Sequence, residues 1–244
     1  MATRSGTGRS NHRDARTAGR EAALSARAAL EGAEPQFCLV FAGSGYDPAA
    51  LLAGIREVAP GASLSGCTAE GVIAGGVSDE SARAVAVLAV TSDRFEFVPL
   101  LVRGYADDPV AAGRELARLE HEISRGDEIG LFVFPDGLLG NCTAFLNALD
   151  LAHPAALPVV GGAAGDSLAF RQTHQFHDAE TASGAVAAVL VRGRGSFEVS
   201  VSHGCIAIGL ERQLTKVEGA WVREIDDQPA WQVFRQYLSG EPED

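Results

Sequence analysis

Residues 37–43 read FCLVFAG, and residues 129–137 read IGLFVFPDG. Both are short apolar runs that end in a glycine, which is the pattern of a buried β strand followed by a turn. An amphipathic helix pattern follows each run, DPAALLAGIREVA at 47–59 and NCTAFLNALDLA at 141–152. The first of these begins with an Asp-Pro pair, suited to an N-cap and a first helical turn. The same strand and helix order therefore occurs twice.

The repeat continues through three further pairs of segments. They are ASLSGCTAEG (62–71) with LPVVGGAAGD (157–166), ARAVAVLAV (82–90) with SGAVAAVLV (183–191), and FEFVPL (95–100) with FEVSVS (197–202). This order predicts an α/β (α+β) fold with a pseudo-symmetric repeat of two strand–helix–strand–strand–strand halves. The halves span about 36–102 and 128–203, and the helix pattern at 108–124 is interpreted as the link between them.

The strands are apolar along most of their length, so they need cover on both faces. Helices should therefore flank the sheets, which predicts layers in the order helix, sheet, sheet, helix. A single mixed sheet is the alternative.

The two ends of the chain differ from its middle. Residues 1–20 are rich in Ser, Gly, Arg and Thr without apolar periodicity, which predicts a disordered tail. A helix at 21–31 opens the single domain expected over 21–238. Near its end, a strand at 220–225 and a helix at 228–238 are expected. The last residues, 239–244, are polar and expected to fray.

Charge and composition exclude several classes of protein. The formal net charge is −12, and an acidic body repels phosphate backbones, so nucleic acid is not expected as a partner. No apolar run is long enough to span a bilayer, and the N-terminus lacks the apolar core of a secretory signal. A cytoplasmic location is therefore expected. The four cysteines stand singly, which predicts free thiols.

The two glycine turns are the first candidate site. Each ends a strand in small residues and brings backbone N–H groups close to anything bound there. The pseudo-repeat allows both turns to line one cleft, although the glycines are equally consistent with tight turns or close sheet packing. The candidate ligand contacts in these turns are Gly66, Cys67, Thr68, Gly161, Gly162 and Asp166. Asp166 is expected either to receive a ligand amine or to cap a turn.

An enzyme is not expected. A nucleophilic Cys67 would need an activating base, the motif is not G-x-S-x-G, and the second copy has Gly162 in its place. An ordinary small thiol that lines the ligand site is the preferred interpretation. Neither turn fits a P-loop or a dinucleotide fingerprint.

The histidines offer weaker alternatives. His174 and His177 should lie on opposite faces of a strand, so we do not expect them to bind one metal ion. His203 ends the final repeat strand and is a candidate ligand contact. One zinc ion held by His203, Cys205 and Cys67 is conceivable, but the sequence cannot place these residues together.

Five segments in order, GCTAEG, VVGGAAGD, SGAVAAVLV, VSHGC and EIDDQPAWQVF, resemble the N-terminal domain of the FIST family, the F-box and intracellular signal transduction proteins. The resemblance covers about residues 36–238. It implies a non-catalytic sensory domain that binds a small ligand, with amino acids proposed. Such domains relay to separate signalling proteins such as histidine kinases or cyclic-dinucleotide enzymes.

The resemblance also implies alternatives. Some relatives are described as haem-binding nitric oxide sensors, for which His203 would be the axial ligand in this chain. Family members usually continue into a FIST C-terminal domain, which this sequence does not include, so a site built between the two domains would be incomplete.

Overall fold

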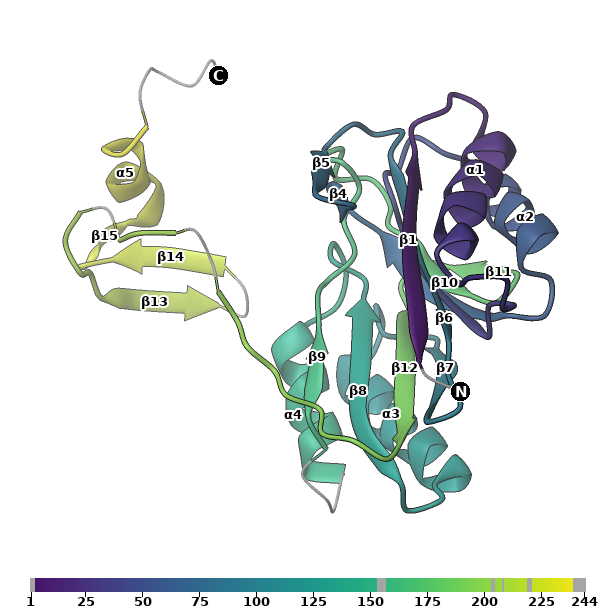
Figure 1. Ribbon diagram of the computed structural model, residues 1–244. Helices are drawn as coiled ribbons and strands as arrows, with labels where there is room; N and C mark the ends of the chain where they lie inside the picture. The colour runs from purple at the N-terminus through teal and green to yellow at the C-terminus, as the bar shows by residue number, and fades with distance from the viewer. Residues whose placement is uncertain (1–2, 153–156, 203–204, 208, 219–220, 239–244) are drawn as a thin grey trace. The chain divides into compact units, whose positions relative to one another are not determined.

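The computed structural model describes residues 3–152, 157–202, 205–207, 209–218 and 221–238, shown in Figure 1. The chain divides into two compact units, Met1–Val199 and Ser200–Asp244, which are described separately.

The first unit contains a six-stranded sheet in the order β1-β6-β2-β3-β10-β11. Its strands are β1 (Arg4–Ser10), β2 (Phe37–Ala42), β3 (Ser63–Thr68), β6 (Val85–Thr91), β10 (Gln175–His177) and β11 (Glu180–Ala182). Only β2 and β3 run parallel, and the other neighbours are antiparallel. A separate hairpin joins β4 (Val72–Ala74) to β5 (Val77–Asp79).

The second sheet has four strands in the order β7-β12-β8-β9. They are β7 (Phe95–Val102), β8 (Glu128–Pro135), β9 (Val159–Gly161) and β12 (Val186–Gly193). Here β8 and β9 are the parallel pair, and β12 is antiparallel to both β7 and β8. The second sheet therefore repeats the β1-β6-β2-β3 part of the first.

Two helices pack on each sheet, as Figure 1 shows. They are α1 (Ala15–Ala28) and α2 (Pro48–Val58) on the first sheet, and α3 (Pro109–Ile123) and α4 (Cys142–Ala152) on the second. Asp14, Asp47 and Asp108 cap the first three helices by accepting from backbone N–H groups. A third apolar cluster, including Phe37, Val90, Phe134 and Val189, joins facing sides of the two sheets. The predicted order of helix, sheet, sheet, helix is confirmed.

The frame of the repeat differs from the prediction. Since β1 borders β6 as β7 borders β12, and α1 packs on α2 as α3 packs on α4, each repeat begins one strand and one helix earlier than expected. The repeats are thus β1 to β6 and β7 to β12. The helix interpreted as a link, α3, is the first helix of the second repeat.

The expected disordered tail at 1–20 was wrong for most of its length. Residues Arg4–Ser10 form β1, and α1 begins at Ala15 rather than at residue 21. The glycines that suggested disorder are needed for packing, because a Cβ on Gly6 or Gly8 would lie 2.2 and 2.0 Å from carbonyl oxygens of α1.

The strand predicted at 197–202 was also wrong. These residues have no regular secondary structure, although the Phe197 ring packs edge-on against Phe132 at 5.3 Å. The physical reason is that both edges of β12 are occupied by β7 and β8, and both edges of β6 by β1 and β2. The fourth strand of the predicted repeat therefore has no place beside the third.

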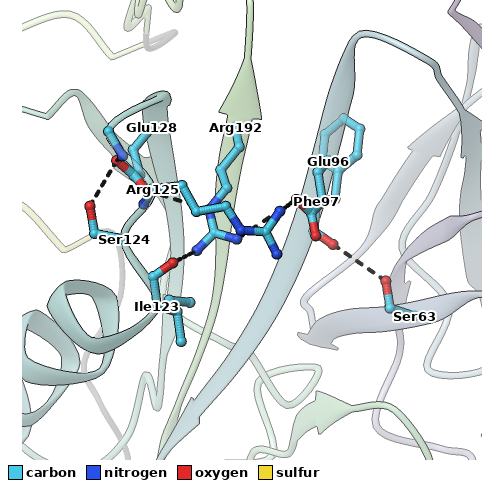
Figure 2. Close-up of polar contacts among 9 residues, drawn as sticks. Ser63, Glu96, Phe97, Ile123, Ser124, Arg125, Glu128 and Arg192 are labelled. Atoms are coloured by element: carbon cyan, nitrogen blue, oxygen red, sulfur yellow. Dashed lines mark hydrogen bonds and ion pairs between the residues drawn. The ribbon is translucent and has the colours of Figure 1, made fainter.

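A buried arginine joins three elements at the end of the second sheet (Figure 2). The Arg192 side chain is 3% exposed, and its guanidinium donates to the carbonyl oxygen of Ile123 at the end of α3. It lies 3.7 Å from a carboxylate oxygen of Glu96 on β7 and 3.5 Å from one of Glu128 on β8. Arg125 donates to the same Glu96 carboxylate at 2.8 Å.

The second unit is a small antiparallel sheet of β13 (Leu214–Glu218), β14 (Trp221–Ile225) and β15 (Gln228–Pro229), followed by α5 (Ala230–Arg235). The predicted strand at 220–225 is confirmed as β14, and the helix predicted over 228–238 is present only over Ala230–Arg235, with Pro229 at the N-cap. The expected fraying of 239–244 lies outside the described residues.

Candidate functional site

The turns that follow β3 and β9 meet at one place in the first unit. The N–H of Gly165 donates to the carbonyl oxygen of Thr68 at 3.0 Å, and the N–H of Asp166 donates to Oε1 of Glu70 at 3.1 Å. The Ser44 hydroxyl, just after β2, donates to the carbonyl oxygen of Asp166 at 2.8 Å. The two repeats therefore contact each other through the two glycine-rich turns that are paired in the sequence.

A cavity of about 440 Å³ opens beside this contact. It is lined by Glu70, Gly71, Val72, Ile73, Ser78, Glu80, Ser167 and Leu168. One wall is the β4–β5 hairpin, and the other is the loop after Asp166. The hairpin closes through Gly75 and Gly76, both with positive φ, as a two-residue type I′ turn requires. We call this cavity the turn cleft.

Asp166 caps the loop that forms the second wall. It is 2% exposed, and its carboxylate accepts from the backbone N–H groups of Phe170, Arg171 and Gln172 at 3.0, 2.6 and 3.1 Å. Burial acts to raise the pKa of Asp166, but these hydrogen bonds outweigh it and hold the pKa below its ordinary value. Of the two roles expected for Asp166, the structure shows the turn cap.

The loop held by Asp166 is strained. Ser167, Leu168 and Phe170 have φ angles of 59°, 59° and 52°, in the left-handed region that favours glycine. Leu168 and Phe170 nevertheless remain 71% and 75% exposed. Strained backbone of this kind clusters at ligand clamps and switch segments.

The predicted glycines are divided between the sheets and the surface. A Cβ on Gly66 or on Gly161 would lie 1.8 Å from the carbonyl oxygen of Val40 or Val133, respectively, on the neighbouring strand. Both glycines therefore permit close approach within a sheet, and neither lines the turn cleft. Gly162 is exposed, and a Cβ added there would meet no atom within 4 Å.

The other predicted contacts are also placed by the strands. Cys67 is 3% exposed in the apolar cluster between the sheets, and burial raises the pKa of its thiol to about 12. Thr68 is buried, and its hydroxyl accepts from the backbone N–H of His174 at 3.0 Å. Thr68 and Asp166 form hydrogen bonds next to the cleft without lining it, while Cys67 lies in the core.

The metal and haem hypotheses gain no support from the described residues. His203 lies outside them, and they contain no group of three or more His, Cys, Asp or Glu side chains that could hold a metal ion. Four cavities in the described part of the chain have no histidine in their linings.

Sequence reasoning missed the side chains that line the turn cleft. Glu70 was part of the quoted turn, at the carboxyl end of a parallel strand, which is where open α/β sheets place ligands. That rule could have selected Glu70 over Cys67. Ser167 and Leu168 carry no sequence signal, because their role depends on the loop conformation that Asp166 holds.

His174, whose backbone N–H donates to the Thr68 hydroxyl, provides a test of how burial affects stability near the turn cleft. Burial lowers the pKa of His174 below its ordinary value, although the charge of Asp136 opposes this. Below about pH 6.5 the unfolded chain then binds more protons than the folded one, so the free energy of unfolding should fall as the pH drops. We expect His174→Gln to flatten this part of the profile in urea unfolding from pH 8 to 5.

The matched control for His174 is the exposed His121 on α3. The profile of His121→Gln shows how far the loss of an exposed imidazole by itself alters the curve between pH 8 and 5. An identical pH profile for His174→Gln and the unchanged chain would show that His174 does not carry the dependence.

A family model described as the FIST N domain matches residues 36–228. The chain belongs to this family. FIST domains are associated with signalling and sensing. The match begins just before β2, so β1 and α1 of this FIST N domain precede the matched region.

Relatives in sequence are uncharacterized proteins. One from Mycobacterium tuberculosis is 27% identical over 239 residues, covering 97% of this chain and 60% of the relative. One from Mycobacterium bovis is 29% identical over 242 residues, covering 93% and 57%. The chain thus spans about 60% of the length of the first relative.

Two solved structures are distantly similar. A cyanuric acid hydrolase has a TM-score of 0.39 and 12% identity, covering 79% of this chain and 69% of the hydrolase. A chorismatase has a TM-score of 0.34 and 14% identity, covering 69% and 51%. Likenesses at this level carry no argument about function.

None of the helices in the described ranges combines the length and the apolar composition of a membrane span.

Proposed function

We propose that this FIST N domain is a non-catalytic sensory module that binds a small amine-bearing molecule, such as an amino acid, in the turn cleft. The bound state would then be relayed to a separate signalling protein. The observation that carries the proposal is the meeting of the two repeats at one cavity, with walls from both. A ligand that touches both walls favours one arrangement of the repeats over another.

The lining of the turn cleft supports a ligand with a positive charge and an apolar part. Glu70 and Glu80 supply carboxylates, which stabilise an ammonium group by charge-assisted hydrogen bonds. Val72, Ile73 and Leu168 supply apolar surface for a side chain. A cavity with a few polar groups among apolar ones is the usual form of a small-molecule site.

The loop after Asp166 supports a route for the relay. Ser167 and Leu168 line the cleft, so a ligand there would act directly on two residues with left-handed backbone. The same loop exposes Leu168 and Phe170 to a partner. Occupancy would thus change the population of loop conformations that the partner meets.

A thermal-shift screen with amino acids and their N-acetyl forms tests the proposal. An amino acid at 100 times its Kd should add about 2.7 kcal/mol of stability, and its N-acetyl form, which lacks the ammonium group, should add none. Glu70→Gln and Glu80→Gln should each weaken the response, because they remove a cleft carboxylate while keeping its shape.

The control variant is Glu115→Gln, which changes an exposed carboxylate on α3. It should respond to amino acids as the unchanged chain does. Equal stabilisation by the free and N-acetylated forms, or an equal response of Glu70→Gln and Glu115→Gln, would refute the amine site. A screen in which no amino acid shifts the transition would do the same.

A further inference from the structure

The two repeats differ at the outer edge of one matching strand. In the first sheet, the outer edge of β3 is covered by β10. In the second sheet, the matching strand β9 is the last in the order, and no described strand pairs with its outer edge. Figure 1 shows β9 beside β8 with α4 behind it. An uncovered strand edge is a template for pairing with another chain.

The covered edge in the first repeat shows what kind of segment fits. The N–H of Thr68 donates to the carbonyl oxygen of His174, and the N–H of Asp178 donates to that of Leu64, both at 2.8 Å. Between these bonds, Phe176 pairs with Gly66, and its side chain is fully buried in the cluster that includes α1 and α2. The strand thus contributes backbone pairing and one apolar anchor.

A charge pair completes this arrangement. Arg56 on α2 donates to Oδ1 of Asp178 at 2.8 Å, and Asp178 stands two residues after the Phe176 anchor. The strand that covers β3 therefore has an apolar residue, Phe176, and two positions later an acidic residue, Asp178, which pairs with the basic Arg56 of the helix.

The same geometry exists in the second repeat without the strand. Gly161 contacts Val133 as Gly66 contacts Val40, which aligns Val159 with Leu64. Asn141 caps α4 as Asp47 caps α2, and counting from these caps aligns Asp150 with Arg56. Leu64 is 1% exposed, whereas Val159 is 37% exposed.

A cavity of about 310 Å³ lies where the Phe176 side chain would be expected in this alignment. Its apolar lining includes Leu131, Leu146, Leu149 and Val159, and its acidic lining is Glu120 and Asp150. The charge at the Arg56 position is therefore reversed. In the first sheet, the β3 edge is covered by the β10–β11 hairpin, which belongs to the second repeat. The matching hairpin of the first repeat, β4–β5, does not cover the β9 edge in return. The linker before it is too short, because only residues 69–71 separate β3 from β4, whereas residues 162–174 separate β9 from β10.

We propose that the β9 edge and this cavity form a docking groove for an extended segment of a partner protein, paired antiparallel to β9. The segment places a Phe or Leu side chain in the cavity and an Arg or Lys two residues later against Asp150. Strand addition to an exposed edge, with pockets for alternate side chains, is an established mode of peptide recognition. The exposed Asp150 carboxylate selects the basic residue by charge complementarity.

The test uses a fluorescent synthetic peptide of residues 172–181 carrying Asp178→Arg, titrated with the full chain. It should bind at least about tenfold more tightly than the unsubstituted peptide, since Asp150 attracts one and repels the other. The chain variant Asp150→Arg should reverse this preference. Asp150 is exposed, so the variant should keep the fold.

Peptide methylation tests the strand pairing without changing the protein. N-methylation at the Phe176 position removes a donor that faces β9 and should abolish binding, while N-methylation at the His177 position, which faces away, should not. Absence of saturable binding, an unchanged preference in Asp150→Arg, or equal effects of the two methylations would overturn the proposal. A dimer of the chain that Asp150→Arg dissociates would assign the edge to a second copy and overturn it as well.

Discussion

Replacing Arg192 with methionine should lower the free energy of unfolding by about 3 kcal/mol. Methionine fills much of the same space, so the loss would report mainly on polar contacts. The guanidinium lies between the carboxylates of Glu96 and Glu128 and donates to the Ile123 carbonyl. Removing it leaves the 15% exposed Glu128 carboxylate without its nearest cation. Urea unfolding followed by circular dichroism measures the change.

The matched control is Arg194, two residues along the chain and exposed. Arg194→Met should change the unfolding free energy by no more than about 0.5 kcal/mol. The double variant Arg192→Met with Glu128→Gln measures the coupling energy between the guanidinium and the Glu128 carboxylate in a double-mutant cycle. A loss of similar size in both single variants would show that the buried position of Arg192 is unimportant.

The layers could be predicted from the sequence because they depend on apolar periodicity. Segments such as FCLVFA at Phe37–Ala42 and VAVLAVT at Val85–Thr91 are buried on both faces, and that burial is written in their composition. The helix starts could also be predicted, since Asp47 and Asp108 both precede a proline and cap the helix that follows. Local signals decided these elements.

The frame of the repeat could not be predicted, because it depends on which strand borders which. The strand β1 is polar and glycine-rich. Gly6 and Gly8 are needed there because α1 packs so closely against them that a Cβ would not fit, and this contact is not visible in the sequence. Conversely, FEVSVS at 197–202 alternates like a strand but has no free strand edge beside β12 or β6. Tertiary context overrides local propensity in both cases.

The sequence predicted that the two glycine turns lie together, but not which side chains line the cleft beside them. Pairing the two glycine turns located the contact between the repeats, and Thr68 and Asp166 do support it. The side chains that line the cleft, Glu70 and Ser167 among them, depend on how the loop after Asp166 folds back. That conformation arises from three backbone hydrogen bonds to one carboxylate, which no residue pattern announces.

Alanine substitution at two adjacent glycines at the end of β9 should have very different effects on the free energy of unfolding. In Gly161→Ala, the new Cβ would lie 1.8 Å from the carbonyl oxygen of Val133, so the backbone of β8 or β9 must move. Forced overpacking against backbone in a sheet should lower the free energy of unfolding by about 3 kcal/mol. In Gly162→Ala, the Cβ meets nothing within 4 Å, and the change should stay within about 0.5 kcal/mol.

This pair of variants also separates packing from ligand contact. Gly161 repeats the position of Gly66, whose Cβ would meet Val40 at the same distance, so Gly66→Ala should show a loss like that of Gly161→Ala. If Gly66 and Gly161 are needed for strand packing and not for ligand contact, Gly162→Ala should keep the stability and the amino-acid response of the unchanged chain. A stable Gly161→Ala protein that has lost only its ligand response would instead place Gly161 in the binding site.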